Sequence, residues 1–173
     1  MAIERNIPIN ISPIGVIHSP FTSTNGVPIQ PAFAQGYEGT VEVYKEFEEA
    51  LLDLEGFERI WLLFWLDRAS KFKLKVRPYL DDKLHGLFTT RAPSRPNPIG
   101  LSCVKLLSVE KNILRICEID ILDGTPLLDI KPYVGKFDCF DVKRNGWLDT
   151  VSKGNTKADN RFYNDKNMTG DKK

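Results

Sequence analysis

Residues 91–102 read Arg-Ala-Pro-Ser-Arg-Pro-Asn-Pro-Ile-Gly-Leu-Ser, and this stretch restricts the fold more than any other. Its three prolines fix φ and remove N–H donors, which excludes a helix or a central strand. Apolar, strand-like runs flank it on both sides, so we expect a stiff loop that presents Arg91 and Arg95. Guanidinium groups on a rigid loop suit an anion or a planar polar ligand, and solvated arginines on a plain connection are an equal alternative.

A second segment of the same kind, Leu-Asp-Gly-Thr-Pro-Leu-Leu-Asp-Ile-Lys-Pro-Tyr, occupies residues 122–133. Asp-Gly followed by Thr-Pro is typical of a tight turn, and apolar residues stand on both sides of it. The turn places a carboxylate and bare backbone at a strand end. Two such loops in one small domain predict one shared site.

Short strands are the main elements that the remaining pattern predicts. Ile60–Leu66 is a continuous apolar run, typical of a fully buried strand. Phe72–Val76 alternates apolar residues with lysines, and Pro78 ends that strand. The other expected strands span residues 40–43, 102–109, 113–121 and 127–134, with a hairpin turn at 110–112. Many short strands and one helix favour a mainly-β barrel or a tightly curved sheet.

The one expected helix is short. Phe47, Ala50, Leu51 and Leu54 recur at helical spacing and form one apolar face. Gly56 stands where a helix C-cap is expected.

Length, charge and terminal sequence limit the class of protein. A chain of 173 residues suits one domain, and its net charge of +1 gives no global positive field for nucleic acid. Any RNA contact must therefore come from a local patch. The chain start lacks the apolar core of a signal peptide, and no run has transmembrane length, so we expect a cytoplasmic protein without a membrane partner.

The sequence lacks the signatures of several common kinds of functional site. No Gly-x-Gly occurs, which argues against a Rossmann fingerprint or a P-loop. The three cysteines are widely spaced and fit neither a disulfide framework nor a zinc site, and we expect no metal. His18 precedes Ser-Pro at a strand end, where a structural role is favoured over catalysis.

In combination, these segments resemble the TsaA-like family, which includes the TrmO-type tRNA N6-methyltransferases. The matching segments are residues 14–21, 28–30, 53–57, 60–63, 91–102 and 122–133. The resemblance covers roughly residues 10–141, and the motifs at 145–148 and 158–162 are similar to those of the shorter archaeal-type members. It predicts a domain at 10–141 and a partly mobile C-terminal extension at 142–173.

The resemblance implies a fold, a cofactor and partners. The fold is a small closed β-barrel with a short helix and an irregular C-terminal tail. The cofactor is S-adenosyl-L-methionine, bound near the interface of a homodimer. The implied reaction is methyl transfer to N6 of threonylcarbamoyladenosine beside the anticodon of tRNA.

Carried over by position, the family's cofactor contacts fall on five segments. They are Pro28, Ile29, Gln30, Asp67, Arg68, Arg91, Leu101, Asp123, Gly124, Thr125 and Pro126. Many relatives have an aromatic residue and a histidine where this chain has Leu66 and Asp67, so that part of the pocket can differ. Asp123 and Gly124 also fit a purely structural turn, and Arg95 can brace the proline loop through backbone carbonyls.

Candidate RNA contacts form two groups. Lys73 and Lys75 lie on one polar face of the predicted strand, which suits phosphate contacts as well as an ordinary solvated edge. Lys131 and Tyr133 follow the Asp-Gly-Thr-Pro turn and could touch a target base by charge and stacking, and Arg95 is a further candidate. Asp129 and Tyr133 are conceivable proton acceptors, but the sequence assigns no catalytic residue.

Two other functions remain compatible with the sequence. One is a non-catalytic S-adenosylmethionine-binding regulatory module. The other is a methyltransferase of the same fold that acts on a different substrate. The tRNA species and the oligomeric state are not fixed by the sequence.

Overall fold

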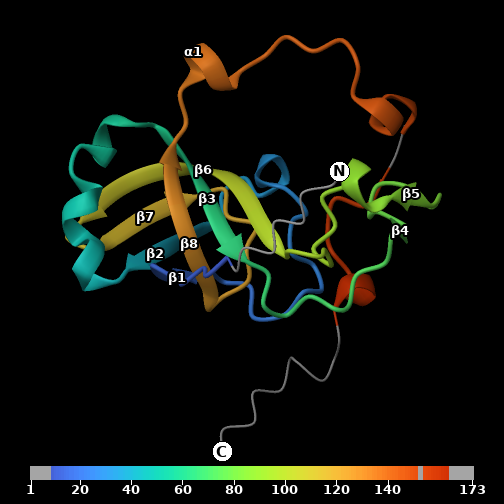
Figure 1. Cartoon of the computed structure of the whole chain (residues 1–173). Coiled ribbons are helices and arrows are strands. Elements are labelled where there is room, and N and C mark those ends of the chain that lie inside the picture. Colours follow the sequence, from blue (N-terminus) through green and yellow to red (C-terminus); the bar gives the residue numbers. More distant parts are fainter. Residues whose placement is uncertain (1–8, 152–153, 164–173) are drawn as a thin grey trace, which may run out of the picture.

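Six antiparallel strands close a barrel in the order β1-β2-β7-β6-β3-β8 (Figure 1). The computed structural model describes residues 9–151 and 154–163. The barrel strands are β1 (Gly15–His18), β2 (Glu38–Val43), β3 (Arg59–Trp65), β6 (Ile99–Glu110), β7 (Ile113–Cys117) and β8 (Thr125–Pro132). The predicted closed, mainly-β barrel is therefore confirmed.

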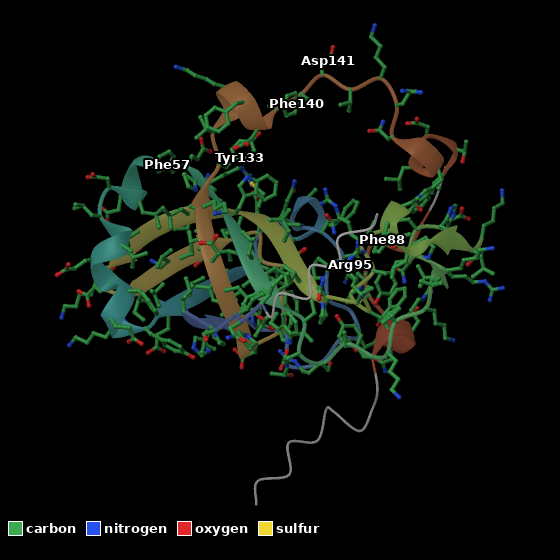
Figure 2. All side chains as sticks on the ribbon, viewed as in Figure 1. Phe57, Phe88, Arg95, Tyr133, Phe140 and Asp141 are labelled. Atoms are coloured by element: carbon green, nitrogen blue, oxygen red, sulfur yellow. The ribbon has the colours of Figure 1, made fainter. Side chains whose placement is uncertain are left out.

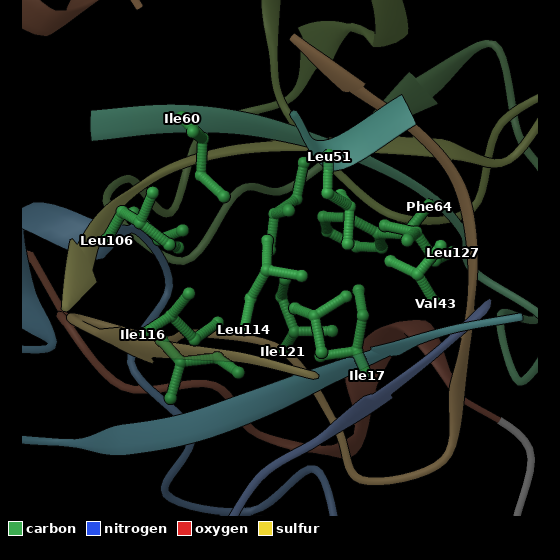
Figure 3. Packing of buried hydrophobic residues seen from close by; sticks show 14 residues of the cluster. Ile17, Val43, Leu51, Ile60, Phe64, Leu106, Leu114, Ile116, Ile121 and Leu127 are labelled. Carbon is green, nitrogen blue, oxygen red and sulfur yellow. The ribbon is translucent and has the colours of Figure 1, made fainter. Parts of the chain in front are cut away.

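Side chains from alternate positions of the strands fill the barrel (Figure 3). On β3, Ile60, Leu62 and Phe64 are buried, whereas the residues between them point outward and are only half-buried. The prediction of a fully buried strand at 60–66 was therefore wrong. A barrel strand encloses one face only, so half of an apolar run must lie on the outside.

The predicted helix is instead two 3-10 segments, Lys45–Leu51 and Leu54–Gly56. Asp53 separates them with a φ of 65°, a left-handed conformation that interrupts the helical hydrogen bonds. Leu51 and Leu54 still pack on the barrel core, as the pattern indicated. The helical C-cap expected at Gly56 is wrong, because the chain continues into extended backbone at Phe57.

The remaining elements are short. A separate two-stranded sheet pairs β4 (Lys75–Val76) with β5 (His85–Gly86). The helix α1 spans Gly135–Asp138, and further 3-10 turns lie at Pro31–Phe33, Leu87–Thr89, Gly146–Thr150 and Asn160–Phe162. None of the helices in the described part of the chain is long and apolar enough to cross a membrane.

Two predicted strands are shorter in the structure. The strand expected at 72–76 pairs only at its last two residues, and Leu74 is 74% exposed because no neighbouring strand covers it. The strand expected at 113–121 ends at Cys117, because Glu118 turns the chain with a φ of 65°. Beyond the end of this strand, Ile119 and Ile121 still pack in the barrel core.

Part of the C-terminal extension packs on the barrel loops. Isolated bridges join Lys157 to Pro28 and Tyr163 to Ala69, and Phe162 belongs to a small apolar cluster. The described residues 154–163 thus form part of the folded body. The rest of the predicted mobile tail, residues 152–153 and 164–173, lies outside the described residues.

Candidate functional site

One large cavity lies beside the barrel, with a volume of about 950 Å³. This volume is in the range that small-molecule sites commonly have, roughly 300–1,000 Å³. Its walls come from segments within residues 24–33, 64–68, 78–80, 88–95, 99–102, 120–125, 147–148 and 158–163. The proline loop and the Asp-Gly-Thr-Pro turn therefore meet at one site, as their sequences predicted.

Most of the predicted cofactor residues line this cavity. They are Pro28, Ile29, Gln30, Asp67, Arg68, Arg91, Leu101 and Thr125. Asp123, Gly124 and Pro126 do not line it, and they lie in or directly beside the turn behind the wall. The Asp-Gly-Thr-Pro turn thus contributes Thr125 to the cavity lining, and its other three residues lie next to Thr125 in the chain.

Hydrogen bonds with β1 and with Ser19 directly after it hold the Asp-Gly-Thr-Pro turn. The Ser19 backbone N–H donates to Asp123 Oδ1 at 3.1 Å, and the Gly124 N–H donates to the Ile17 carbonyl at 2.9 Å. Gly124 has a φ of 74°, which glycine adopts without steric cost. The Asp123 side chain therefore joins β8 to β1 instead of facing the cavity.

Arg68 connects this turn to the cavity. Its Nη2 donates to the Asp123 carbonyl and to Thr125 Oγ1, both at 2.9 Å. Thr125 Oγ1 in turn donates to the Leu122 carbonyl at 2.7 Å. Arg68 is thus a brace that holds the turn in place while part of its side chain lines the wall.

The two arginines of the proline loop have different surroundings: Arg91 is exposed, and Arg95 is bonded to the loop backbone. Arg91 is exposed at the cavity and donates a hydrogen bond to Gln30 Oε1. Arg95 Nη1 donates to the Thr90 carbonyl at 2.9 Å, and its guanidinium lies 5.6 Å from the Phe88 ring centroid (Figure 2). Arg95 thus braces the loop through a backbone carbonyl, one of the two roles expected for it.

Gly100 lies where β6 passes the cavity, and its backbone packs directly on the Phe64 ring. A Cβ at this position would lie 2.1 Å from that ring, too close for any side chain without a shift of Phe64. The glycine of the Pro-Ile-Gly segment is therefore required by packing. It brings the end of the proline loop close to the barrel core.

A carboxylate that the sequence did not single out also lines the cavity. Ser102 Oγ donates to Asp120 Oδ1 at 2.6 Å, and burial raises the pKa of Asp120 to about 7. A lone acidic residue within the apolar run Ile119–Leu122 was the available signal. The sequence pattern predicts this run as part of a strand, and strand periodicity alone does not distinguish a cavity-facing carboxylate from a solvated one.

The C-terminal extension contributes to the same cavity. Trp147 lines it, donates from Nε1 to the Thr89 carbonyl at 2.8 Å, and stacks on His85 with 4.4 Å between ring centroids. Leu148 and Tyr163 also line it. The site thus crosses the boundary at residue 141 that the sequence predicted.

Among the candidate RNA residues, Arg95 lines the main cavity, and the others lie elsewhere. Lys73 and Lys75 line a second hollow of about 590 Å³ together with Lys71, Arg77 and Arg161. Lys131 and Tyr133 lie outside both hollows on β8 and just beyond it. Lys131 Nζ pairs with Asp129 Oδ2 at 2.7 Å. Among the described residues, no group of three or more His, Cys, Asp or Glu side chains could hold a metal ion.

The closed barrel and its adjoining cavity define the class as a small β-barrel protein with a cavity of the size that small-molecule sites have. The family model of the tRNA-methyltransferase O (TrmO) N-terminal domain matches residues 16–139, and the chain belongs to this family. The resemblance to the TsaA-like family is thereby confirmed.

Individual relatives show how far the likeness extends. A probable S-adenosyl-L-methionine-binding protein of Pyrococcus abyssi is 54% identical over 87% of this chain and 83% of its own length. A human tRNA (adenine(37)-N6)-methyltransferase is 33% identical over 85% of this chain and 37% of its own. A crystal structure of TrmO from Pseudomonas aeruginosa matches with a TM-score of 0.69 and 42% identity. That match covers 81% of this chain and 62% of the other, so this chain spans just under two thirds of the bacterial protein.

Proposed function

We propose that this protein is an S-adenosylmethionine-dependent tRNA methyltransferase, and that its target is N6 of threonylcarbamoyladenosine beside the anticodon. The observation that carries the proposal is the convergence of the family's separate motifs on one cavity of suitable size. The cavity combines a mostly apolar wall with a few polar groups, as sites for nucleoside-like ligands do.

The cavity residues suit the parts of the cofactor. Leu101 offers an apolar wall, and Arg91 offers an exposed guanidinium for a carboxylate. Gln30 holds Arg91 by its side-chain oxygen and so orients that guanidinium. We assign cofactor binding to the eight predicted residues that line the cavity. Asp123, Gly124 and Pro126 would support the wall from behind.

The proposed reaction depends mainly on positioning. The bound cofactor supplies an electrophilic methyl group. The N6 nitrogen of the target is a poor nucleophile, because its lone pair is delocalised into the ring and the carbamoyl group. Asp129 and Tyr133, the conceivable proton acceptors, do not line the cavity of this chain. The proposed contribution of the described residues is in-line placement of the reactants, and the N6 proton would be lost to water once the methyl group is attached.

The decisive experiment uses labelled cofactor and total tRNA from cells that lack the native enzyme. After incubation, the tRNA is digested and the labelled nucleoside is identified. Label in methylated threonylcarbamoyladenosine is the expected result. Label in another nucleoside or another fraction would indicate a same-fold methyltransferase with a different substrate.

A non-catalytic S-adenosylmethionine-binding module is the second candidate. One observation favours it: the archaeal relatives carry names that refer only to S-adenosylmethionine binding. Tight cofactor binding without any labelled product in total tRNA would support the module and contradict the enzyme.

Arg68→Ala is expected to weaken S-adenosylmethionine binding by about 10- to 100-fold. The substitution removes two hydrogen bonds from a charged donor, each of which contributes roughly 1.5–3 kcal/mol when made to a buried acceptor. The turn that forms one wall would then lose its brace. Titration calorimetry with the cofactor measures the effect.

Arg115→Ala is the matched control, because Arg115 is an exposed arginine that pairs with Glu38 on the barrel surface. Cofactor affinity should be unchanged in this variant. Equal affinity in the Arg68 and Arg115 variants would show that the brace does not shape the site.

The second hollow is the proposed contact for the tRNA backbone. Lys71, Lys73, Lys75, Arg77 and Arg161 gather around it, in a chain of almost neutral overall charge. The double variant Lys73→Ala/Lys75→Ala is expected to reduce the slope of log affinity against log salt by about 1–2, since each phosphate contact contributes roughly 0.7–0.9. Filter binding of tRNA across a salt series measures the slope.

The control variant Lys45→Ala/Lys111→Ala removes two exposed lysines elsewhere on the barrel. Its salt slope and its cofactor affinity should equal those of the parent protein. A slope that falls equally in both double variants would indicate only a general charge effect.

A homodimer is proposed from the family resemblance and from the outer face of β3 and β6. Leu63 pairs with Leu101 and Trp65 with Ile99, so these apolar side chains share one outward face. Leu101 is 48% exposed and also lines the cavity. A contiguous exposed apolar face of this kind commonly marks an interface. Light scattering should give the mass of a dimer.

The segment at residues 135–145, which contains α1, carries further exposed apolar side chains. Phe137 and Phe140 are exposed on it, and Figure 2 shows Phe140 beside Asp141 above the barrel. These side chains would be covered in the proposed dimer. A monomer mass at all concentrations would contradict the dimer.

A further inference from the structure

Asp120 stands out from the other polar residues of the cavity. It follows β7, between the buried residues Ile119 and Ile121, and its neighbour Ser102 is 3% exposed. The Ser102 hydroxyl donates to Asp120 Oδ1 at 2.6 Å. One specific donor thus holds this carboxylate in a largely apolar wall. Burying a charged carboxylate there costs free energy unless a further hydrogen-bond or ionic partner compensates for it.

No described side chain forms an ion pair with this carboxylate, although Arg91 lies near enough to lower its pKa. None of the described side chains donates a hydrogen bond to Asp120 Oδ2. The nearby arginines have other partners: Arg68 holds the Asp123–Thr125 turn and Arg91 bonds to Gln30. Asp120 therefore presents to the cavity an acidic group that has no ion-pair partner among the described residues.

We propose that Asp120 is the residue that recognises the positive charge of the bound cofactor, and that it makes the site prefer the charged cofactor over its neutral-sulfur product. The inference rests on the proposed binding of S-adenosylmethionine in this cavity. It adds a specificity-determining residue to the predicted set.

The preference follows from the change of charge in the reaction. When the methyl group leaves, the sulfonium becomes a neutral thioether, and the adenosine and amino-acid parts stay the same. A carboxylate in an apolar wall gains from a cation nearby and gains nothing from a thioether. The product would thus be held less tightly than the cofactor and would leave more readily.

The expected size of the preference comes from linkage. A positive charge within about 4–6 Å lowers a carboxyl pKa by about 1–3 units, and each unit corresponds to about a tenfold change in relative affinity. The cofactor should therefore bind at least about tenfold more tightly than the product when Asp120 is ionised.

Other polar groups act on Asp120 or line the cavity beside it. Arg91 lowers the pKa of Asp120 slightly, and burial raises the pKa of Tyr163 to about 12, so that Tyr163 stays neutral. Arg68 and Asp67 also line the cavity. Because burial raises the pKa of Asp120 to about 7, the preference should grow between about pH 5 and pH 8.

The test compares three ligands by calorimetry at pH 5.5 and pH 8. They are S-adenosylmethionine, S-adenosylhomocysteine, and sinefungin, in which an amine-bearing carbon replaces the methylsulfonium. The amino-acid part is common to all three, so its titration cancels in the affinity ratios. The variants are Asp120→Asn, Ser102→Ala and the control Glu46→Gln, which makes the same acid-to-amide change at an exposed position.

In the parent protein and in Glu46→Gln, both charged ligands should bind at least about tenfold more tightly than S-adenosylhomocysteine at pH 8, with a smaller ratio at pH 5.5. Asp120→Asn should bring the ratio close to one at both pH values. Ser102→Ala removes a hydrogen bond that lowers the pKa of Asp120, so its ratio should rise at higher pH than in the parent.

Two results would overturn the inference in distinguishable ways. If Asp120→Asn weakens all three ligands equally, Asp120 contacts a part that they share, and cofactor binding itself stands. If the parent protein binds none of the ligands, the proposed function fails together with the inference.

Discussion

Asp120→Asn is expected to raise the free energy of unfolding of the cofactor-free protein by about 4 kcal/mol at pH 8. Burial raises the pKa of Asp120 from 3.8 to about 7, and each pKa unit corresponds to about 1.4 kcal/mol. Asparagine has a similar shape, can still accept the Ser102 hydrogen bond, and is never charged. The substitution therefore removes the cost of a buried charge.

The sign and the pH range follow from proton binding. Below about pH 3 the carboxyl is neutral in both states, and the two proteins should have the same stability. Between about pH 4 and pH 7 the unfolded chain loses this proton while the folded protein keeps it, so the parent loses stability as pH rises. Above pH 7 the difference is constant.

Urea unfolding of the cofactor-free proteins at pH 4.5, 6 and 8 measures this difference. The gain in Asp120→Asn should grow across the series, and Glu46→Gln at an exposed position should show no such trend. A variant that is less stable than the parent at pH 8 would show that the Asp120 carboxylate is favourably solvated in the free protein. If Asp120→Asn is more stable and no longer prefers the charged cofactor, it follows the usual pattern in which a functional residue lowers the stability of the free protein.

Leu62→Ala is expected to lower the free energy of unfolding by about 2–5 kcal/mol, the range for a leucine removed from a packed core. Leu62 is 0% exposed and lies in the middle of β3, where it pairs with Ser102 of β6 and Ile130 of β8. The cavity left by the substitution cannot close easily, because strands on both sides hold the backbone. Chemical unfolding followed by tryptophan fluorescence measures the loss.

Leu107→Ala is the matched control for this prediction. Leu107 also lies in a barrel strand, at the register shift of β6, but it is 40% exposed. Its removal should cost well below half as much, since part of its surface already contacts water. Similar losses in both variants would mean that the barrel interior does not dominate the stability.

The sequence predicted the elements whose signal is local. Three prolines at 93–98 require an irregular loop, and Asp123-Gly124 requires a turn, whatever surrounds them. The family resemblance then implied the closed barrel and brought eight cavity residues together by position. The local pattern gave the wrong helix type at 45–56, because the left-handed Asp53 has no clear signature in side-chain periodicity.

Tertiary structure alone decided which face of each segment has which role. The apolar run of β3 became half interior and half exterior because the barrel closes around one face. Asp123 turned to Ser19 and away from the cavity, whereas Asp120, three residues earlier, became part of its wall. The direction of a side chain depends on strand register and on contacts between distant segments. A single sequence therefore determined the loops, the turn and the family, and the three-dimensional packing determined which of the acidic groups faces the ligand.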